Sequence, residues 1–325
     1  MLLTKPRLVQ KLKDFHTYLK HNDGKIGTKQ RGIDMNLNNA CNLRCEHCFT
    51  ESPLGTKVKD FLPPEKIAEI ADQADELGIF EWDIQGGEVL LRPDILYPTL
   101  KAIKTERFYM YVTTNGWYMD EDVAKKLADH GINRVSVSID SMDPKVHDKF
   151  RGKEGSWKRA MEALEHVQKA GMHPYLNITV GHYNAKSEDI KMMLQYSKDK
   201  KHLIEMRKEY KNIMRNLWNP FDKNFESVIG CNTVNRVYIT PTGDVLSCPY
   251  VHIKIGNVYD NTLKEISEHG FSFKRFRENS QACLAGEDQG FVKNFMSKKG
   301  TSIFKPVEAS EIFPKDHYSK FSFDK

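Results

Sequence analysis

Three cysteines within eight positions are the first feature of this chain that points to chemistry. Cys41, Cys45 and Cys48 have the spacing C-x3-C-x2-C in the segment CNLRCEHCF, and more than 180 residues separate them from the next cysteine. Thiolates are ligands for zinc and for iron-sulfur clusters, and a closed site of either kind normally uses four ligands. The spacing therefore predicts a metal centre with one position that no cysteine fills.

The chain has six cysteines in two widely separated triples, the second being Cys231, Cys248 and Cys283. Three disulfides are typical of short secreted chains that lack a core, and no signal peptide is evident here. A structural zinc site usually pairs its ligands as C-x2-C, which the first triple matches poorly even if His47 takes part. An iron-sulfur cube on three thiolates leaves one iron open for a substrate or cofactor. We therefore favour a cluster over these two alternatives.

The composition is that of a globular protein. Of 325 residues, 39% are apolar and 29% charged, which disfavours a disordered or fibrous chain. No apolar run approaches the roughly 18 residues that a membrane span needs, so we expect a cytoplasmic protein without a membrane partner. The 49 basic and 44 acidic residues give a diffuse charge of +5, which suits an anionic small molecule better than a nucleic acid.

Strand and helix patterns alternate through the first two thirds of the chain. Residues 1–30 read as a helical lead-in and a polar connector. Alternating apolar residues then predict strands, and apolar residues at helical spacing predict the helices between them. The strands are expected at 33–38, 80–84, 108–114, 134–140 and 174–180, and the helices at 64–77, 93–104, 120–130, 156–170 and 187–198. This alternation predicts an α/β fold with a parallel sheet, closed or partly closed as a barrel.

Polar motifs follow these strands at the ends where such folds place their chemistry. The cysteine triple follows the first strand, and the segments GGE, TTNG and SID follow the next three. Because the carboxyl ends of parallel strands meet at one edge of the sheet, these motifs are expected to share one site.

Residues 31 to about 198 resemble the radical S-adenosylmethionine (SAM) superfamily, since the C-x3-C-x2-C loop and the three later motifs occur in that family's order. The resemblance implies a partial (β/α)6 TIM-like barrel. It also implies that Cys41, Cys45 and Cys48 hold a [4Fe-4S] cluster whose open iron binds SAM. Reductive cleavage of SAM would then give a 5'-deoxyadenosyl radical that removes hydrogen from a substrate, with the cofactor supplying the chemistry.

The resemblance also implies which residues contact SAM. The GGE motif would line the methionine amino group, His47 would approach the adenine through its backbone, and Ser138 and Arg151 would contact the ribose and carboxylate, with Asp140 as a weaker candidate. A plain turn is the alternative for the glycine pair and for Asn115. The full expected set is Gln85, Gly86, Gly87, Glu88, His47, Asn115, Ser138, Arg151 and Asn177.

The second triple brackets a predicted hairpin. Val237 and Ile239 alternate on one strand, PTGD forms the turn, and a second strand leads to Cys248. Together with the position of Gly243, this resembles the opening of SPASM and Twitch domains, which carry auxiliary clusters. The resemblance implies a second [4Fe-4S] cluster in a small C-terminal α+β hairpin domain. Two buried structural cysteines are the alternative.

The chain departs from these families in two ways. SPASM domains carry seven cysteines and most Twitch domains four, whereas this chain has three, with Cys283 as the expected third ligand. Glu287, Asp288, a substrate atom or solvent is expected as the fourth. Residues 202–217 also read as a helix that directly follows the one at 187–198, so no sixth strand is expected between them. Either the barrel closes differently or the chain omits residues near Lys200. The apolar face of that helix comprises Leu203, Met206, Tyr210, Ile213, Met214 and Leu217.

These patterns divide the chain into a lead-in (1–30), a radical SAM barrel (31–200), a linker helix (201–225) and an auxiliary-cluster domain with a C-terminal tail (226–325). A small polar metabolite of the sugar or nucleotide-sugar type is the favoured substrate, because only about 30 residues precede the first strand. Peptide modification is the alternative, and a non-catalytic iron-sulfur protein a weaker one. A reductant such as flavodoxin or ferredoxin is expected. With all six cysteines assigned as ligands, oxidation, dehydration or decarboxylation is favoured over inversion of a carbon centre.

Overall fold

The computed structural model describes residues 4–48, 60–180, 188–200, 203–208, 231–278, 283–285, 288–296 and 306–324, with residues 203–208 described by their backbone. Within these residues one mixed sheet contains ten strands in the order β10-β9-β8-β7-β1-β2-β3-β4-β5-β6. Its strands are β1 (Gly32–Asn36), β2 (Glu81–Gln85), β3 (Tyr109–Thr114), β4 (Arg134–Ser138), β5 (His173–Val180), β6 (Leu203–Lys208), β7 (Arg236–Ile239), β8 (Asp244–Leu246), β9 (Ile253–Asn257) and β10 (Val307–Glu308).

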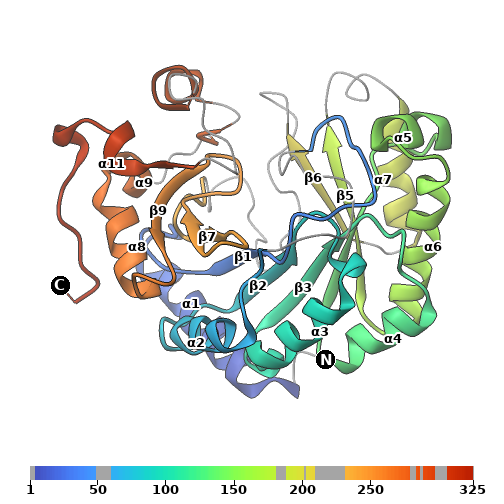
Figure 1. Cartoon of the computed structure of the whole chain (residues 1–325), viewed down its shortest axis with the longest axis horizontal. Helices are drawn as coiled ribbons and strands as arrows, with labels where there is room; N and C mark the ends of the chain where they lie inside the picture. The colour runs from blue at the N-terminus through green and yellow to red at the C-terminus, as the bar shows by residue number, and fades with distance from the viewer. Residues whose placement is uncertain are drawn as a thin grey trace.

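Helices connect the parallel strands and cover the outer side of the curved sheet, as Figure 1 shows for α4, α6 and α7. The α-helices are α1 (Pro6–His21), α2 (Pro64–Glu76), α3 (Pro93–Ile103), α4 (Glu121–Asp129), α5 (Pro144–Arg151), α6 (Ser156–Lys169), α7 (Glu188–Lys200), α8 (Leu263–Ser272), α9 (Lys274–Arg277), α10 (Gln289–Phe291) and α11 (Ala309–Ile312). Four shorter helical segments are η2 (Val89–Leu91), η3 (Thr105–Arg107), η4 (Val292–Met296) and η5 (Lys315–His317).

Strands β1 to β6 run parallel to one another, each paired with the next. The predicted α/β barrel class is therefore confirmed. Alternate residues of each strand point to opposite sides, so Ile33 and Met35 join the core beneath the helices while Asp34 lies on the other face. The apolar side stabilises the fold, and the polar side lines the interior of the barrel.

Two elements differ from the sequence-based expectation. The helix expected over 202–217 is wrong for residues 203–208, which form β6 in parallel register with β5. The sixth strand is therefore present, and the rest of the expected helix and linker lies outside the described residues. The sequence LIEMRK does not alternate apolar and polar residues, and its three charged residues resemble a helical surface. Helix α5 was not expected, although Asp143 caps its start by accepting from the Lys145 backbone and Gly152 ends it with φ 68°.

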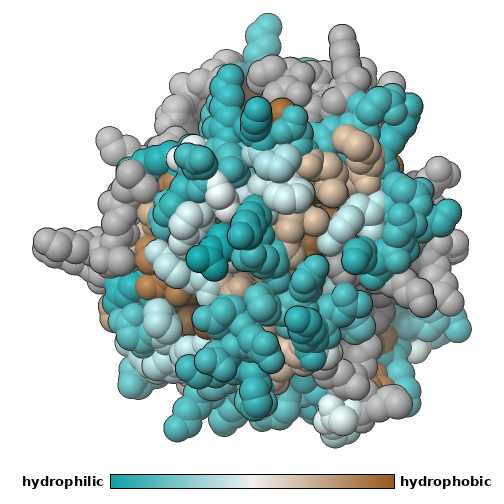
Figure 2. Space-filling model, turned by 90° about the vertical axis from the view of Figure 1, so that its right-hand side faces the viewer, coloured by the Kyte–Doolittle hydropathy of each residue, from teal (hydrophilic) through white to brown (hydrophobic). Residues whose placement is uncertain are grey.

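The C-terminal hairpin continues the same sheet. Strand β7 pairs in parallel with β1, and β8 pairs antiparallel with β7, which confirms the predicted hairpin. Figure 1 shows β7 and β9 with α8 and α11 on the left of the barrel strands. The opposite side, over α5, α6 and α7, is mostly hydrophilic, with small apolar groups between the hydrophilic residues (Figure 2). In the described part of the chain, no helix is long and apolar enough to cross a membrane.

Candidate functional site

The cysteine loop leaves the carboxyl end of β1 and is held against the end of β2. The backbone N–H of Gly87 donates to the Asn38 carbonyl at 2.8 Å, and that of Glu88 donates to the Ala40 carbonyl at 2.6 Å. A Cβ on Gly87 would lie 2.1 Å from the Ala40 oxygen. The glycine pair therefore lets two backbone segments meet. Its closest neighbour in the structure is the cysteine loop itself.

The thiols of the first triple lie close enough to influence one another. Burial raises the pKa of Cys41 to about 12, and Glu88, Cys45 and Cys48 raise it further, while the Leu43 backbone N–H, 3.4 Å from the sulfur, opposes the shift. Three clustered thiols beside a carboxylate become thiolates readily only with a cation among them. No group of three His, Cys, Asp or Glu side chains in the described residues is arranged for a single metal ion.

Glu88 is a buried carboxylate that ties three segments together. It accepts from the Thr114 hydroxyl at 2.6 Å, the Asn115 backbone at 2.8 Å and the Leu90 backbone at 3.0 Å. Burial raises its pKa, and these donors oppose the shift. The side chain of Asn115 in turn donates to the Asn42 oxygen at 2.9 Å. These contacts fix the end of β3 to the cysteine loop.

Arg151 approaches the cysteine loop from the other side. It is the last residue of α5, and its Nη1 lies 3.6 Å from the Cys45 sulfur. Its Nε donates to Asp140 Oδ2 at 2.6 Å, so the guanidinium bridges a carboxylate and a thiol. The His47 ring stacks on Phe150 with centroids 4.6 Å apart. The structure thus brings Arg151, Asp140 and His47 to the first triple.

Three further expected site residues lie on the strands. Ser138 is the last residue of β4 and the register partner of Asn177, which lies three residues before the end of β5, and both are half-buried. Gln85 is the buried last residue of β2, and its carbonyl accepts from the Leu37 backbone at 2.7 Å. All the expected cofactor residues therefore belong to the edge of the sheet that carries the first triple.

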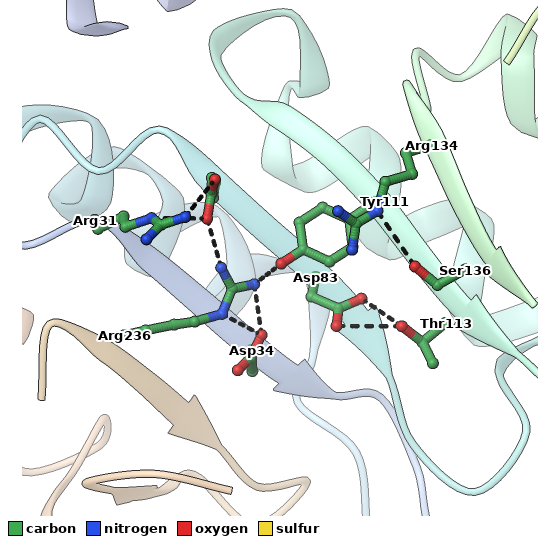
Figure 3. Close-up of polar contacts among 9 residues, drawn as sticks. Arg31, Asp34, Asp83, Tyr111, Thr113, Arg134, Ser136 and Arg236 are labelled. Carbon is green, nitrogen blue, oxygen red and sulfur yellow. Dashed lines mark hydrogen bonds and ion pairs between the residues drawn. The ribbon is translucent and has the colours of Figure 1, made fainter. Parts of the chain in front are cut away.

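The barrel interior beneath this edge carries an ionic network that Figure 3 shows. Arg236 of β7 donates to Asp34 of β1 at 2.7 Å and to Glu81 of β2 at 2.6 Å, and it also contacts the Tyr111 hydroxyl. The Arg134 guanidinium also lies over two tyrosine rings, 4.0 Å from the centroid of Tyr111 and 4.0 Å from that of Tyr175. The network joins the C-terminal hairpin to the barrel.

Polar residues nearer the cysteine loop continue this network. The Thr113 hydroxyl donates to the two Asp83 oxygens at 3.1 and 3.2 Å, and Ser136 accepts from Arg134 at 3.2 Å (Figure 3). These interior residues were not predicted, because only the apolar half of each alternating strand was used to predict the strands. The polar half of segments such as EWDIQ and RVSVS was the signal that could have found them.

The second triple is gathered where the hairpin strands start and end. Burial raises the pKa of Cys248 well above its usual value, and the nearby thiols of Cys231 and Cys283 raise it further. The Cys231 sulfur lies 2.8 Å from the Thr233 hydroxyl, and Cys283 is exposed. The three residues therefore form a second group with the donor chemistry for an iron-sulfur cluster.

Asp288, one candidate for a fourth ligand, already has partners for both of its oxygens. One oxygen accepts from the Phe291 backbone at 2.8 Å and so caps α10, and the other contacts Arg275. Ligation of iron by Asp288 would require these contacts to break. Glu287 lies outside the described residues.

Comparison with known families agrees with this geometry. Residues 35–196 match the Radical SAM superfamily, and residues 231–285 match SPASM, an iron-sulfur cluster-binding domain. The chain therefore belongs to the radical SAM enzymes and carries a SPASM domain in its C-terminal region, as the sequence predicted. The first domain implies a [4Fe-4S] cluster and SAM, and the second implies auxiliary iron-sulfur clusters.

Individual relatives act on different substrates. The chain is 30% identical to a probable GTP 3',8-cyclase of Methanocaldococcus jannaschii over 54% of this chain and 57% of that protein. It is 30% identical to the Fe-coproporphyrin III synthase of Methanosarcina barkeri over 49% of this chain and 39% of that protein. Thus the chain spans about half the length or less of these relatives.

A solved structure of anSMEcpe with bound AdoMet and Kp18Cys peptide has a similar fold. Its TM-score is 0.57 at 18% identity, covering 90% of this chain and 93% of that chain. At this identity the likeness concerns the fold, so it supports the barrel with its C-terminal domain and leaves the substrate open.

Proposed function

We propose that this chain is a radical SAM enzyme that removes a hydrogen atom from a small polar metabolite. The observation that carries the proposal is the gathering of three thiols with Glu88 and Arg151 at one edge of a parallel sheet. When bound there, a [4Fe-4S] cluster and SAM would supply a 5'-deoxyadenosyl radical. A one-electron reductant such as flavodoxin or ferredoxin would provide the electron.

The chain's own residues would hold and orient these groups. Cys41, Cys45 and Cys48 would be the cluster ligands, and the Glu88 contacts would fix the loop that carries them. We propose that SAM is bound by Gln85, Gly86, Gly87, Glu88, His47, Asn115, Ser138, Arg151 and Asn177. We also propose Cys231, Cys248 and Cys283 as ligands of an auxiliary cluster.

The polar barrel interior supports a polar substrate. Its described inner face carries carboxylates, guanidinium groups and hydroxyls, and these groups hydrogen-bond well with sugars and nucleotides but poorly with apolar molecules. The similarity to a probable GTP 3',8-cyclase points in the same direction, since GTP is a nucleotide. We therefore propose a sugar or nucleotide-sugar derivative, with oxidation, dehydration or decarboxylation as the outcome.

Deuterium transfer tests the substrate class. The reconstituted enzyme would be incubated anaerobically with SAM, reductant and perdeuterated sugars or nucleotide sugars, and 5'-deoxyadenosine would be analysed by mass spectrometry. Deuterium in 5'-deoxyadenosine with one of these compounds is the expected result. Transfer from a deuterated peptide alone would replace the proposal with peptide modification.

A further inference from the structure

We propose that Arg151 sets the reduction potential of the first cluster through its contact with Cys45, with Asp140 limiting the effect. This inference rests on the proposed function, because it requires a cluster on Cys41, Cys45 and Cys48. It assigns Arg151 a role in addition to the SAM contact that the family resemblance implies. Arg151 would be a positioning residue that acts through a cluster ligand.

The backbone holds the guanidinium in place beside the sulfur. The residues on either side of Cys45 are bound to the last two residues of α5, since the Arg44 N–H donates to the Arg151 carbonyl and the Glu46 N–H to the Phe150 carbonyl, both at 3.1 Å. Gly152 then turns the chain away, and a Cβ there would lie 2.6 Å from the Arg44 oxygen. Helix α5 therefore acts as a clamp on the segment around Cys45.

Asp140 fixes the other side of the guanidinium. Its Oδ2 accepts from Arg151 Nε, and its Oδ1 accepts from the Thr179 backbone at 3.0 Å. Arg151 is 6% exposed and Asp140 1% exposed, so water screens neither charge. The guanidinium is thus fixed between a carboxylate at 2.6 Å and a sulfur at 3.6 Å.

The sign of the effect follows from charge. A cluster gains one negative charge on reduction, and a buried cation or a hydrogen bond to a ligand sulfur stabilises that charge. Cys41 has a neutral backbone donor, Leu43 N–H, whereas Cys45 has a charged one. Arg151 should therefore make the cluster easier to reduce, and Asp140 should oppose it.

Two substitutions of opposite charge test this inference. We would titrate the full-length reconstituted protein by EPR-monitored redox titration, with the first cluster's signal identified by its loss in Cys45→Ala. Arg151→Met should lower the midpoint potential by about 59 mV or more, which is a tenfold change for one electron. Asp140→Asn should shift it the other way, and Arg151→Lys should lie between Arg151→Met and the wild type. The matched control is Lys149→Met on the exposed side of α5. Its midpoint potential should correspond to a less than twofold change in the one-electron equilibrium constant.

The outcomes separate this inference from the proposed function. If the wild type holds no cluster on the first triple, the proposed function fails. If the wild type cleaves SAM but Arg151→Met and Arg151→Lys hold as much iron as the wild type and titrate like the control, only the role of Arg151 is refuted. A shift of the midpoint potential in the same direction for Asp140→Asn and Arg151→Met would also refute this role. Removal of a negative and of a positive charge should shift the potential in opposite directions, whereas a purely structural disturbance need not. If Arg151→Met fails to hold iron, Arg151→Lys and Asp140→Asn decide.

Discussion

The two cysteine triples lie at opposite ends of neighbouring parallel strands and are built differently. The first follows the carboxyl end of β1, whereas Cys231 precedes the start of β7, which pairs with β1. Buried partners surround the first site, including Glu88 and Arg151, while Cys283 of the second site is exposed. The same ligand type therefore meets two environments. The first places a guanidinium and a carboxylate beside its thiols, whereas the second combines a thiol shifted by burial, Cys248, with an exposed one, Cys283.

Loss of a ligand in the first site should have the largest effect. Cys45→Ala removes one of three thiolates, so the first cluster should not form and formation of 5'-deoxyadenosine should fall to background. Iron content should drop from about eight to about four per chain. The matched variant Cys283→Ala should retain SAM cleavage. If Cys45→Ala still produced 5'-deoxyadenosine, the first triple would not be the SAM site.

Replacement of the second triple should separate cleavage of SAM from turnover. With Cys231, Cys248 and Cys283 all changed to Ala, iron should fall to about four per chain while SAM cleavage in the absence of substrate stays within severalfold of wild type. Substrate turnover should be lost. A wild-type content near four irons, or zinc at this site, would be incompatible with an auxiliary cluster.

Between the two sites, Arg236 should matter for stability. Arg236→Met would leave Asp34 and Glu81 buried without the guanidinium that pairs with both. Breaking such a pair costs about 3–5 kcal/mol, so the free energy of unfolding measured in urea should fall by that amount. Arg159→Met, at an exposed ion pair with Glu162, should cost less than about 1 kcal/mol. Equal effects of the two changes would show that the interior network does not join the hairpin to the barrel.

Acid should weaken the first region through His147. Burial, with the Arg151 charge, lowers the pKa of His147 to about 4, and its Nδ1 accepts from the Asp140 backbone at 3.2 Å. The unfolded state therefore binds the proton first as the pH falls. The contribution of His147 to the free energy of unfolding is complete above about pH 6.5. As the pH falls from about 6.5 to 4, this contribution is lost, by up to about 3 kcal/mol. The free energy of unfolding should depend less steeply on pH in this range for His147→Gln than for the wild type. An unchanged slope against pH would contradict the assignment.

The sequence was most informative where pattern and chemistry coincide. Buried residues such as Ile33 and Trp82 alternate with polar ones, which made the parallel strands readable, and the cysteine spacing identified the first site. The C-terminal hairpin was predicted for the same reason.

The errors arose where tertiary contacts override local pattern. Residues 203–208 form β6 because β5 offers a partner edge, which helical periodicity cannot show. The contact of Arg151 with Cys45 joins residues 106 positions apart, so no local signal could place it. The glycine pair was expected to admit the cofactor, and what the structure shows beside Gly87 is the Ala40 backbone.

We propose above all that the first triple binds SAM on an open iron. The most direct test is to reconstitute the wild-type protein anaerobically, add reductant and SAM, and measure 5'-deoxyadenosine together with iron. We expect 5'-deoxyadenosine from protein that carries iron on Cys41, Cys45 and Cys48. Protein that holds four irons on these cysteines and forms no 5'-deoxyadenosine would contradict it.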